Sequence, residues 1–215
     1  MKKIFALIIC TSFLISALNA QVIFRTRPVY RYRSIPEHRN YHLPNFKPSV
    51  NIFFGYGIPN LDKYELLEFG NYYHTSVHQT GPAYGTIDYQ FNRRMSIGAT
   101  ISYGKVSAPY YRYNNTTPVF TGTLKNTSLL LNFTRYLFTG NEKIIPYFKT
   151  AIGVNLWTQD YIDQSGNKAV IADDPTALAY QVSIGIKLMP SNNVGFFIEA
   201  GYGKYILSTG LTFKF

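Results

Sequence analysis

The chain has 215 residues, a formal net charge of +10 and a single cysteine, and aromatic residues make up 17% of it. One cysteine excludes an internal disulfide framework. Beyond the first twenty residues no stretch of about 18 apolar residues occurs, which excludes a helical membrane protein.

Residues 1–20 read as a cleavable signal peptide. Lys2 and Lys3 precede an apolar stretch from Ile4 to Leu18, and small residues then offer a cleavage site after Ala20. The apolar stretch is short for a membrane span, which needs roughly 20 residues. Cys10 lacks the small preceding residues of a lipoprotein signal, so we expect it to leave with the signal peptide.

Residues 21–47 form a basic arm rich in Arg, Tyr and Pro, in which prolines interrupt any regular element. Arginine stacks on aromatic rings and binds carboxylates and phosphates with two hydrogen bonds. Two interpretations stay open: a solvated leader, or a periplasmic contact with an acidic partner, either cell-wall polymer or another envelope protein. Nucleic acid is not expected as a partner of an exported chain. The candidate contact residues are Arg25, Arg27, Arg31, Arg33 and Arg39.

From residue 48 onward the chain falls into segments in which apolar and small or polar residues alternate. A period of two places the two sets on opposite faces of a strand. The segments are centred on residues 50–58, 81–91, 97–103, 128–134, 148–156, 178–188, 196–202 and 207–215. They predict eight strands of about 9–11 residues, the length that a tilted membrane strand requires.

The connections between these segments are alternately short and long. Short turns are expected at residues 92–94, 139–143 and 190–193, and long loops at about 59–79, 106–122 and 158–175. Outer-membrane barrels alternate short periplasmic turns with long external loops. The pattern predicts an all-β fold, an eight-stranded antiparallel up-and-down transmembrane β-barrel over residues 48–215, with both termini in the periplasm. A soluble lipocalin-like barrel is disfavoured, because small and charged residues occupy the face that a narrow lumen demands.

The closing strand adds a second signal, because apolar Leu211, Phe213 and Phe215 alternate with polar residues up to the last aromatic ring. Together with the Gly-Tyr-Gly strand ends at Tyr56 and Tyr202, the chain resembles the small eight-stranded outer-membrane barrels of the OmpA/OmpX type over residues 48–215. The resemblance implies that the closing strand is the signal read by the barrel-assembly machinery. It also implies outer-membrane lipid and lipopolysaccharide as surroundings. The peptidoglycan-binding domain of OmpA itself is lacking.

Four charged residues, Asp88, Lys149, Lys187 and Glu199, project into the lumen on this register. Unpaired buried charges are costly, so opposite signs are expected to meet. One interpretation is a salt-bridge network that fills the lumen, and the other is a gated ion path. Eight strands leave an interior only wide enough for side chains, which favours the network and negligible conductance.

The expected loops contain residue types that can carry chemistry. His74 and His78, with Ser76 between them, admit a metal pair or a hydrolase site, but no Ser-His-acid arrangement is visible. Four aspartates, at positions 160, 163, 173 and 174, admit calcium, although their spacing lacks the EF-hand pattern. We therefore predict no catalytic residue, no metal site and no cofactor.

The function predicted from the sequence is an integral outer-membrane barrel with a structural or interaction role. Its loops and its basic arm are the expected contact sites. A lipid-modifying outer-membrane enzyme and an accessory barrel of a secretion system are the alternatives.

Overall fold

The computed structural model describes residues 46–69, 71–74, 76–113, 115–137, 143–169 and 175–215, which belong to one compact unit, Asn45–Phe215. The predicted signal peptide and the five arginines of the arm lie outside the described residues. No helix in the described ranges is long and apolar enough to cross a membrane.

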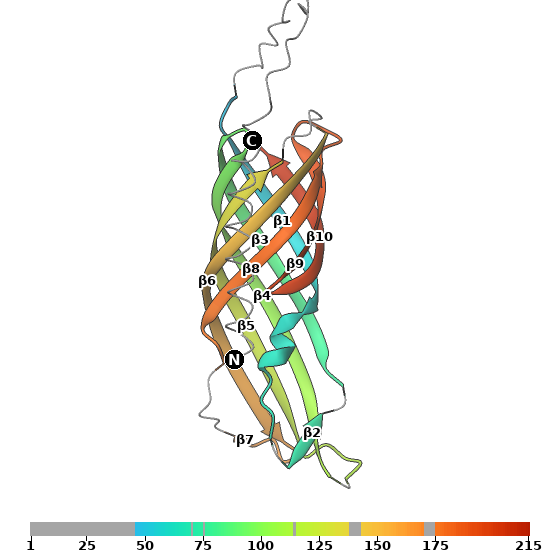
Figure 1. Cartoon of the computed structure of the whole chain (residues 1–215). Coiled ribbons are helices and arrows are strands. Elements are labelled where there is room, and N and C mark those ends of the chain that lie inside the picture. Colours follow the sequence, from blue (N-terminus) through green and yellow to red (C-terminus); the bar gives the residue numbers. More distant parts are fainter. Residues whose placement is uncertain (1–45, 70, 75, 114, 138–142, 170–174) are drawn as a thin grey trace, which may run out of the picture. The chain divides into compact units, whose positions relative to one another are not determined.

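The unit is built from antiparallel strands with one short 3-10 helix (Figure 1). The strands that form the barrel wall are β1 (Ser49–Asn60), β3 (His78–Asn92), β4 (Met95–Arg112), β5 (Phe120–Tyr136), β6 (Ile144–Asp163), β8 (Leu178–Leu188), β9 (Val194–Tyr202) and β10 (Tyr205–Lys214). Two short strands, β2 (Tyr72–His74) and β7 (Lys168–Ala169), pair with the ends of β4 and β6. The helix η1 (Leu61–Glu65) follows β1 directly.

The barrel is closed, because its first and last strands pair with each other. β1 and β10 run antiparallel in a register that places Phe54 opposite Leu211, and Val50 exchanges two backbone hydrogen bonds with Phe215. Each of the eight wall strands therefore has a hydrogen-bonded neighbour on both sides. A ring without open edges satisfies the backbone within hydrocarbon. The predicted eight-stranded antiparallel barrel is confirmed.

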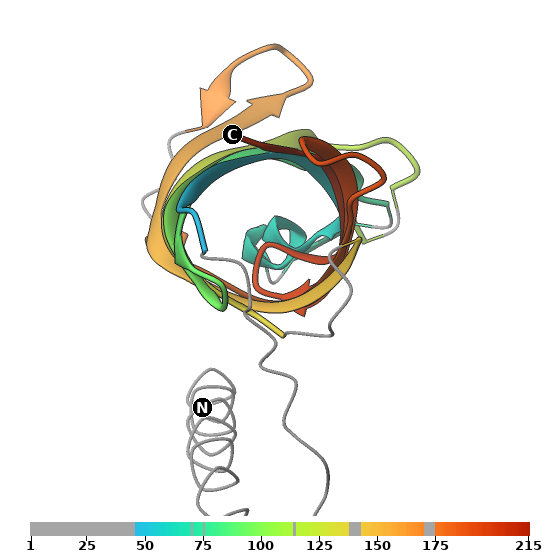
Figure 2. The same ribbon diagram turned by 90° about the horizontal axis from the view of Figure 1, so that it is seen from above.

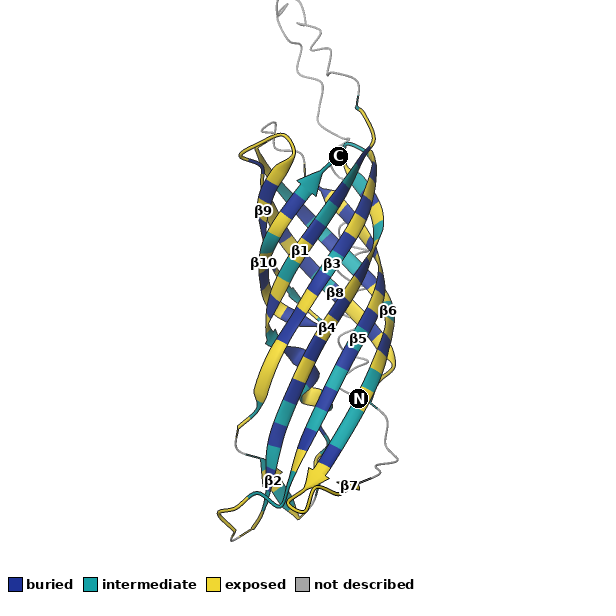
Figure 3. Ribbon diagram, turned by 180° about the vertical axis from the view of Figure 1, so that it is seen from behind, coloured by how far each residue is buried: buried dark blue, intermediate teal, exposed yellow. Residues whose placement is uncertain are grey.

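Buried and exposed residues alternate along the wall strands (Figure 3). Many of the exposed ones are large and apolar, whereas most of the buried ones are small or polar, with some aromatic residues among them. On β5, for example, Leu129 and Leu131 are exposed, whereas Ser128 and Asn132 are buried. A continuous apolar belt of this kind is a lipid-facing surface. Lys125 and Arg135 border the belt on β5, ten residues apart, which is about 33 Å along the strand and roughly 25 Å across a membrane at the usual tilt. The barrel spans a membrane with its strands.

Three strands are much longer than predicted: β4, β5 and β6 have 18, 17 and 20 residues. The expected long loops at 106–122 and 158–175 were wrong in extent, because strand pairing continues to Tyr110↔Phe120 and Phe120↔Asp163. These strand ends, with β2 and β7, form a sheet that continues past the belt at the end opposite the C-terminal end of β10 (Figure 1). We call this sheet the extension.

In the extension the apolar and polar faces of the strands are exchanged, so that apolar residues face inward and polar residues face outward. Val106, Tyr110 and Leu124 are buried on its inner face, whereas Lys105 and Lys125 point outward. The inner face is covered by the segment that follows η1, whose Leu66, Leu67 and Phe69 join the same apolar cluster. This pattern, with apolar residues on the inner face and polar ones on the outer face, indicates that water rather than lipid surrounds the extension.

Candidate functional site

The middle of the lumen is organised around Glu199 of β9. Lys149 Nζ donates to Glu199 Oε1 at 3.1 Å, and Tyr147 Oη donates to the same oxygen at 2.7 Å. Tyr205 Oη donates to Oε2 at 2.5 Å, and Ser183 Oγ lies 3.4 Å from that atom. The ion pair is almost fully buried, with 5% and 1% of the two side chains exposed. This carboxylate is thus tied to β6, β8 and β10 at once.

The other two predicted lumen charges are also buried, but each has neutral partners. Asp88 accepts from Asn132 Nδ2 at 3.1 Å and from Thr134 Oγ1 at 3.4 Å. Lys187 donates to Asn51 Oδ1 at 3.1 Å and lies 5.2 Å from the centre of the Tyr136 ring. The structure thus brings together Lys149 and Glu199 of the four residues, and it holds Asp88 and Lys187 separately.

Aromatic rings fill the space between these polar groups. Phe53, Tyr84, Phe197 and Tyr205 form one buried cluster, in which the Tyr84 and Tyr205 rings stack at 5.3 Å. The Tyr84 ring lies over Gly55, its direct cross-strand neighbour on β1, where a Cβ atom would lie 2.5 Å from Tyr84 Cζ. An inward glycine therefore makes room for an aromatic ring inside the barrel.

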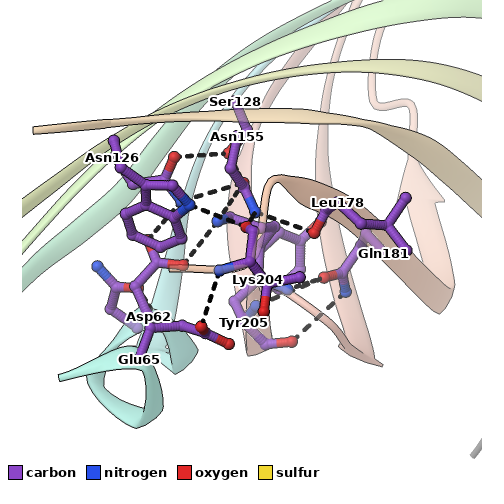
Figure 4. Close-up of polar contacts among 12 residues, drawn as sticks. Asp62, Glu65, Asn126, Ser128, Asn155, Leu178, Gln181, Lys204 and Tyr205 are labelled. Atoms are coloured by element: carbon purple, nitrogen blue, oxygen red, sulfur yellow. Dashed lines mark hydrogen bonds and ion pairs between the residues drawn. The ribbon is translucent and has the colours of Figure 1, made fainter. Parts of the chain in front are cut away.

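A second polar layer closes the mouth of the barrel at the extension end (Figure 4). Lys204, in the β9–β10 turn, donates to Asp62 Oδ1 of η1 at 2.6 Å and to Asn155 Oδ1 at 3.1 Å. Asn126 Nδ2 donates to Asp62 Oδ2 at 3.1 Å, and Leu61 N bonds to the Lys204 carbonyl at 3.1 Å. Seen along the barrel, η1 and this turn lie inside the ring (Figure 2). We call η1 and the β9–β10 turn, joined by the Asp62–Lys204 ion pair, the mouth plug.

A small cavity lies between the two layers, with Lys149 on its wall toward one layer and Lys204 toward the other. Its volume is about 20 Å³, and about 10–15 Å³ suffices for one water molecule. The remaining lining residues are Tyr84, Thr100, Ser102, Leu130, Ala151, Gln181 and Tyr205. The space therefore has room for about one water molecule.

The extension has a small core of its own, centred on Phe69. Its ring meets those of Tyr110, Phe120 and Tyr161 edge-on, with centroid distances of 5.4, 5.4 and 5.9 Å. Tyr110 Oη donates to the Leu67 carbonyl at 2.8 Å, which fixes the covering segment on the sheet. The region beyond the membrane is therefore a packed fold and not a set of separate loops.

The candidate catalytic and calcium residues take ordinary positions. His74 lies on β2 and packs edge-on against Tyr110, and His78 pairs with Ser107 in the β3–β4 ladder, while Ser76 is exposed. Within the described ranges no three His, Cys, Asp or Glu side chains gather as a metal site would need.

Of the four loop aspartates, Asp160 and Asp163 are part of β6. Asp160 accepts from Lys168 at 2.9 Å, and Asp163 accepts from the backbone of Ser165 and Asn167 in the β6–β7 turn. Asp173 and Asp174 lie outside the described residues. Of the predicted assembly residues, Leu211 on β10 and Phe215, directly after the end of β10, are exposed, and the Phe213 ring meets Phe54 edge-on at 6.3 Å.

Reasoning from the sequence missed the mouth plug and the core of the extension. Asp62 and Lys204 lie in connections, where no strand period assigns a facing direction. The core of the extension could have been predicted from the sequence. Apolar Val106, Ala108 and Tyr110 alternate with Lys105 and Ser107 as in a strand, but the apolar residues occupy the positions that are polar or small in the barrel part of the same strand.

No family model and no curated protein matches the chain. Among solved structures it is similar to Ail, the attachment invasion locus protein of Yersinia pestis, in complex with the heparin analogue sucrose octasulfate. That match has 12% identity, covers 78% of this chain and 97% of that chain, and has a TM-score of 0.42. Ail in a phospholipid bilayer nanodisc gives 13% identity, 78% and 98% coverage, and a TM-score of 0.40. The barrel architecture rests on the closed ring of strand pairs and on the apolar belt.

Proposed function

We propose that this protein is a closed outer-membrane barrel that presents a folded contact surface and neither conducts ions nor performs catalysis. The filled lumen carries this proposal. Two polar layers and an aromatic cluster lie across the barrel, and the described cavity between them measures about 20 Å³. The contact surface is the extension, in which a packed apolar core keeps the ends of β4, β5 and β6 folded beyond the lipid.

The proposal includes an orientation. The end with the short turns and the described C-terminal strand end lies in the periplasm, and the extension lies outside the cell, as in barrels with short periplasmic turns. The basic arm would then meet periplasmic partners, and an acidic partner suits its arginines. The variant Leu124→Ala, described in the Discussion, loosens the extension. Protease added to intact cells that carry this variant should cleave the extension and leave the periplasmic turns intact.

Conductance in planar bilayers tests the closed lumen. The full mature chain should give no steady single-channel currents, because the aromatic cluster blocks the barrel. Large, steady currents from folded protein would contradict the proposal.

The variant Asp62→Ala shows which layer closes the lumen. It removes the carboxylate partner of Lys204, leaves Asn155 as an acceptor and should loosen the mouth plug, so that the η1 segment becomes sensitive to protease. Conductance should stay absent, because the Glu199 layer and the Tyr84–Tyr205 stack lie deeper. The variant Lys63→Ala, which changes η1 without touching the ion pair, is the matched control.

A further inference from the structure

One row of outward residues lies just past the lipid-facing belt on four adjacent strands. Thr80, Lys105, Lys125 and Thr158 are direct cross-strand neighbours on β3, β4, β5 and β6. Directly opposite residues share a face of the sheet. The level nearer the middle of the membrane ends the belt and comprises Ala83, Tyr103, Thr127 and Leu156. We call the four-residue row the headgroup row.

The two lysines of the headgroup row stand directly opposite each other, an arrangement that is unfavourable for like charges. Lys125 lies 3.4 Å from Asp160 Oδ2, but Asp160 is one level farther from the membrane and is shared with Lys168 at 2.9 Å. In the described part of the chain no ion pair involves Lys105. The row therefore carries uncompensated positive charge, and an anion between the two ammonium groups would stabilise it.

The depth of the row identifies the anion. Lys125 and Arg135 bracket the apolar part of β5 at a separation that matches a hydrocarbon thickness of about 25 Å, so Lys125 lies at the level of lipid headgroups. The headgroups at this level carry phosphate. The row contains no carboxylate, and Thr80 and Thr158 add hydroxyl donors on either side of the lysines. Lysine acts on phosphate as a point charge, so an exact geometry is not required.

We propose that the headgroup row binds the phosphate of a phosphorylated glycolipid of the outer leaflet, the lipid A part of lipopolysaccharide. The choice of leaflet rests on the orientation given under the proposed function. The phosphate would lie between the Lys105 and Lys125 ammonium groups, with the acyl chains along the belt at Tyr103 and Leu156. The barrel would thereby fix one lipid at the foot of the extension.

The test uses the full mature chain in nanodiscs of phosphatidylcholine that contain either bis-phosphorylated or fully dephosphorylated lipid A. The phosphorylated lipid should raise the temperature of heat-modifiable unfolding, and native mass spectrometry should show it retained on the barrel. The dephosphorylated lipid should do neither. In Lys105→Gln/Lys125→Gln the temperature shift should be lost and retention should fall at least tenfold.

Control variants separate a binding site from a general charge effect. Lys63→Gln removes one charge at the same end of the barrel but outside the row, and it should keep the full shift. Lys105→Arg should keep most of it, and its folding is checked by its mobility on a gel. Equal shifts with both lipids, or a full shift in the double glutamine variant, would overturn the proposal. An equal shift from inorganic phosphate alone would do the same, because the site would then be a free-anion site.

The nanodisc carries the probe lipid in both leaflets, so the result does not depend on which way the barrel is inserted. A failure of the lipid test would leave the closed lumen and the orientation standing, and these are measured by conductance and by cleavage in cells.

Discussion

The strand β5 passes through two regions of the molecule and reverses its pattern between them. In the barrel its apolar Leu129 and Leu131 face outward and Asn132 faces inward, whereas in the extension Leu124 is buried and Thr123 and Lys125 face outward. The backbone pairing with β4 and β6 continues without a shift of register across this point. The side-chain pattern therefore follows the medium outside the sheet, which changes from hydrocarbon to water.

The inner faces of the two regions differ for the same reason. The interior of the barrel is narrow and its outer wall is already apolar, so hydrogen-bonded polar groups and rings can fill it. The extension has water on its outer face, so its stability comes from an apolar inner face covered by the segment with Phe69. Each region should respond to a different kind of substitution.

The largest effect is expected inside the barrel. Glu199→Ala leaves the buried Lys149 ammonium without its carboxylate, and breaking such a pair costs about 3–5 kcal/mol of unfolding free energy. Urea titration of the protein in lipid vesicles, followed by the fluorescence of Trp157, measures it. The double variant Lys149→Met/Glu199→Leu should recover most of the loss, because it removes both charges. If Glu199→Ala is as stable as the wild type, water must reach Lys149 and the lumen is hydrated.

The next effect separates the outer faces of the two regions on one strand. Leu131→Lys places a charge against lipid near the middle of the belt and should lower the unfolding free energy by about 2–4 kcal/mol. Thr121→Lys makes the same addition on the outer face of the extension and should change it by no more than about 0.5 kcal/mol. Equal losses from the two variants would place the extension inside the membrane.

The inner face of the extension gives a local effect. Leu124→Ala removes apolar contacts from the buried cluster and should destabilise the extension by about 2 kcal/mol, the lower end for a buried leucine, because water can enter there. Limited proteolysis should cut near residues 66–77 while the barrel keeps its heat-modifiable mobility. Thr123→Ala, on the outer face next to it, should remain resistant.

The sequence predicted the wall of the barrel well, because a period of two against lipid leaves a regular pattern in every strand. The inward positions of Asp88, Lys149, Lys187 and Glu199 follow from that pattern. Their partners do not, because Asn51, Asn132 and Tyr147 come from strands distant in the chain and depend on the register around the ring. The joint role of the four charges in stiffening the lumen stays a prediction.

The expected loops were the main error. At residues 106–112 and 158–163 the strands continue past the predicted ends, and residues such as Val106 and Tyr161 place apolar side chains on the inner face. A search for strands with apolar residues on the outer face therefore stops too early. The mouth plug could not be predicted from the sequence, for a different reason. Lys204 meets Asp62 only because a short turn and a 3-10 helix enter the same mouth from opposite sides of the closure between β1 and β10.

The smallest effect concerns the outer surface of the extension and depends on pH. The hydrogen bond from Lys168, joined by one from Lys125, holds the pKa of Asp160 below its usual 3.8. A lowered carboxyl pKa adds stability that is complete above the usual pKa and is lost as the pH falls through the lowered one. The pairs are partly exposed, so the contribution is below about 1 kcal/mol.

Hydrogen exchange of the extension between pH 3 and pH 6 measures this contribution. Wild-type β6 and β7 should lose protection toward the acid end, and Asp160→Asn should be slightly less protected at pH 6 and nearly level with the wild type at the acid end. The pKa of Asp163 is also lowered, chiefly by the backbone of Asn167, so Asp160→Asn retains a residual slope of the same sign. A difference between the variant and the wild type that grows toward acid pH would show that Asp160 does not stabilise the sheet as a charged group.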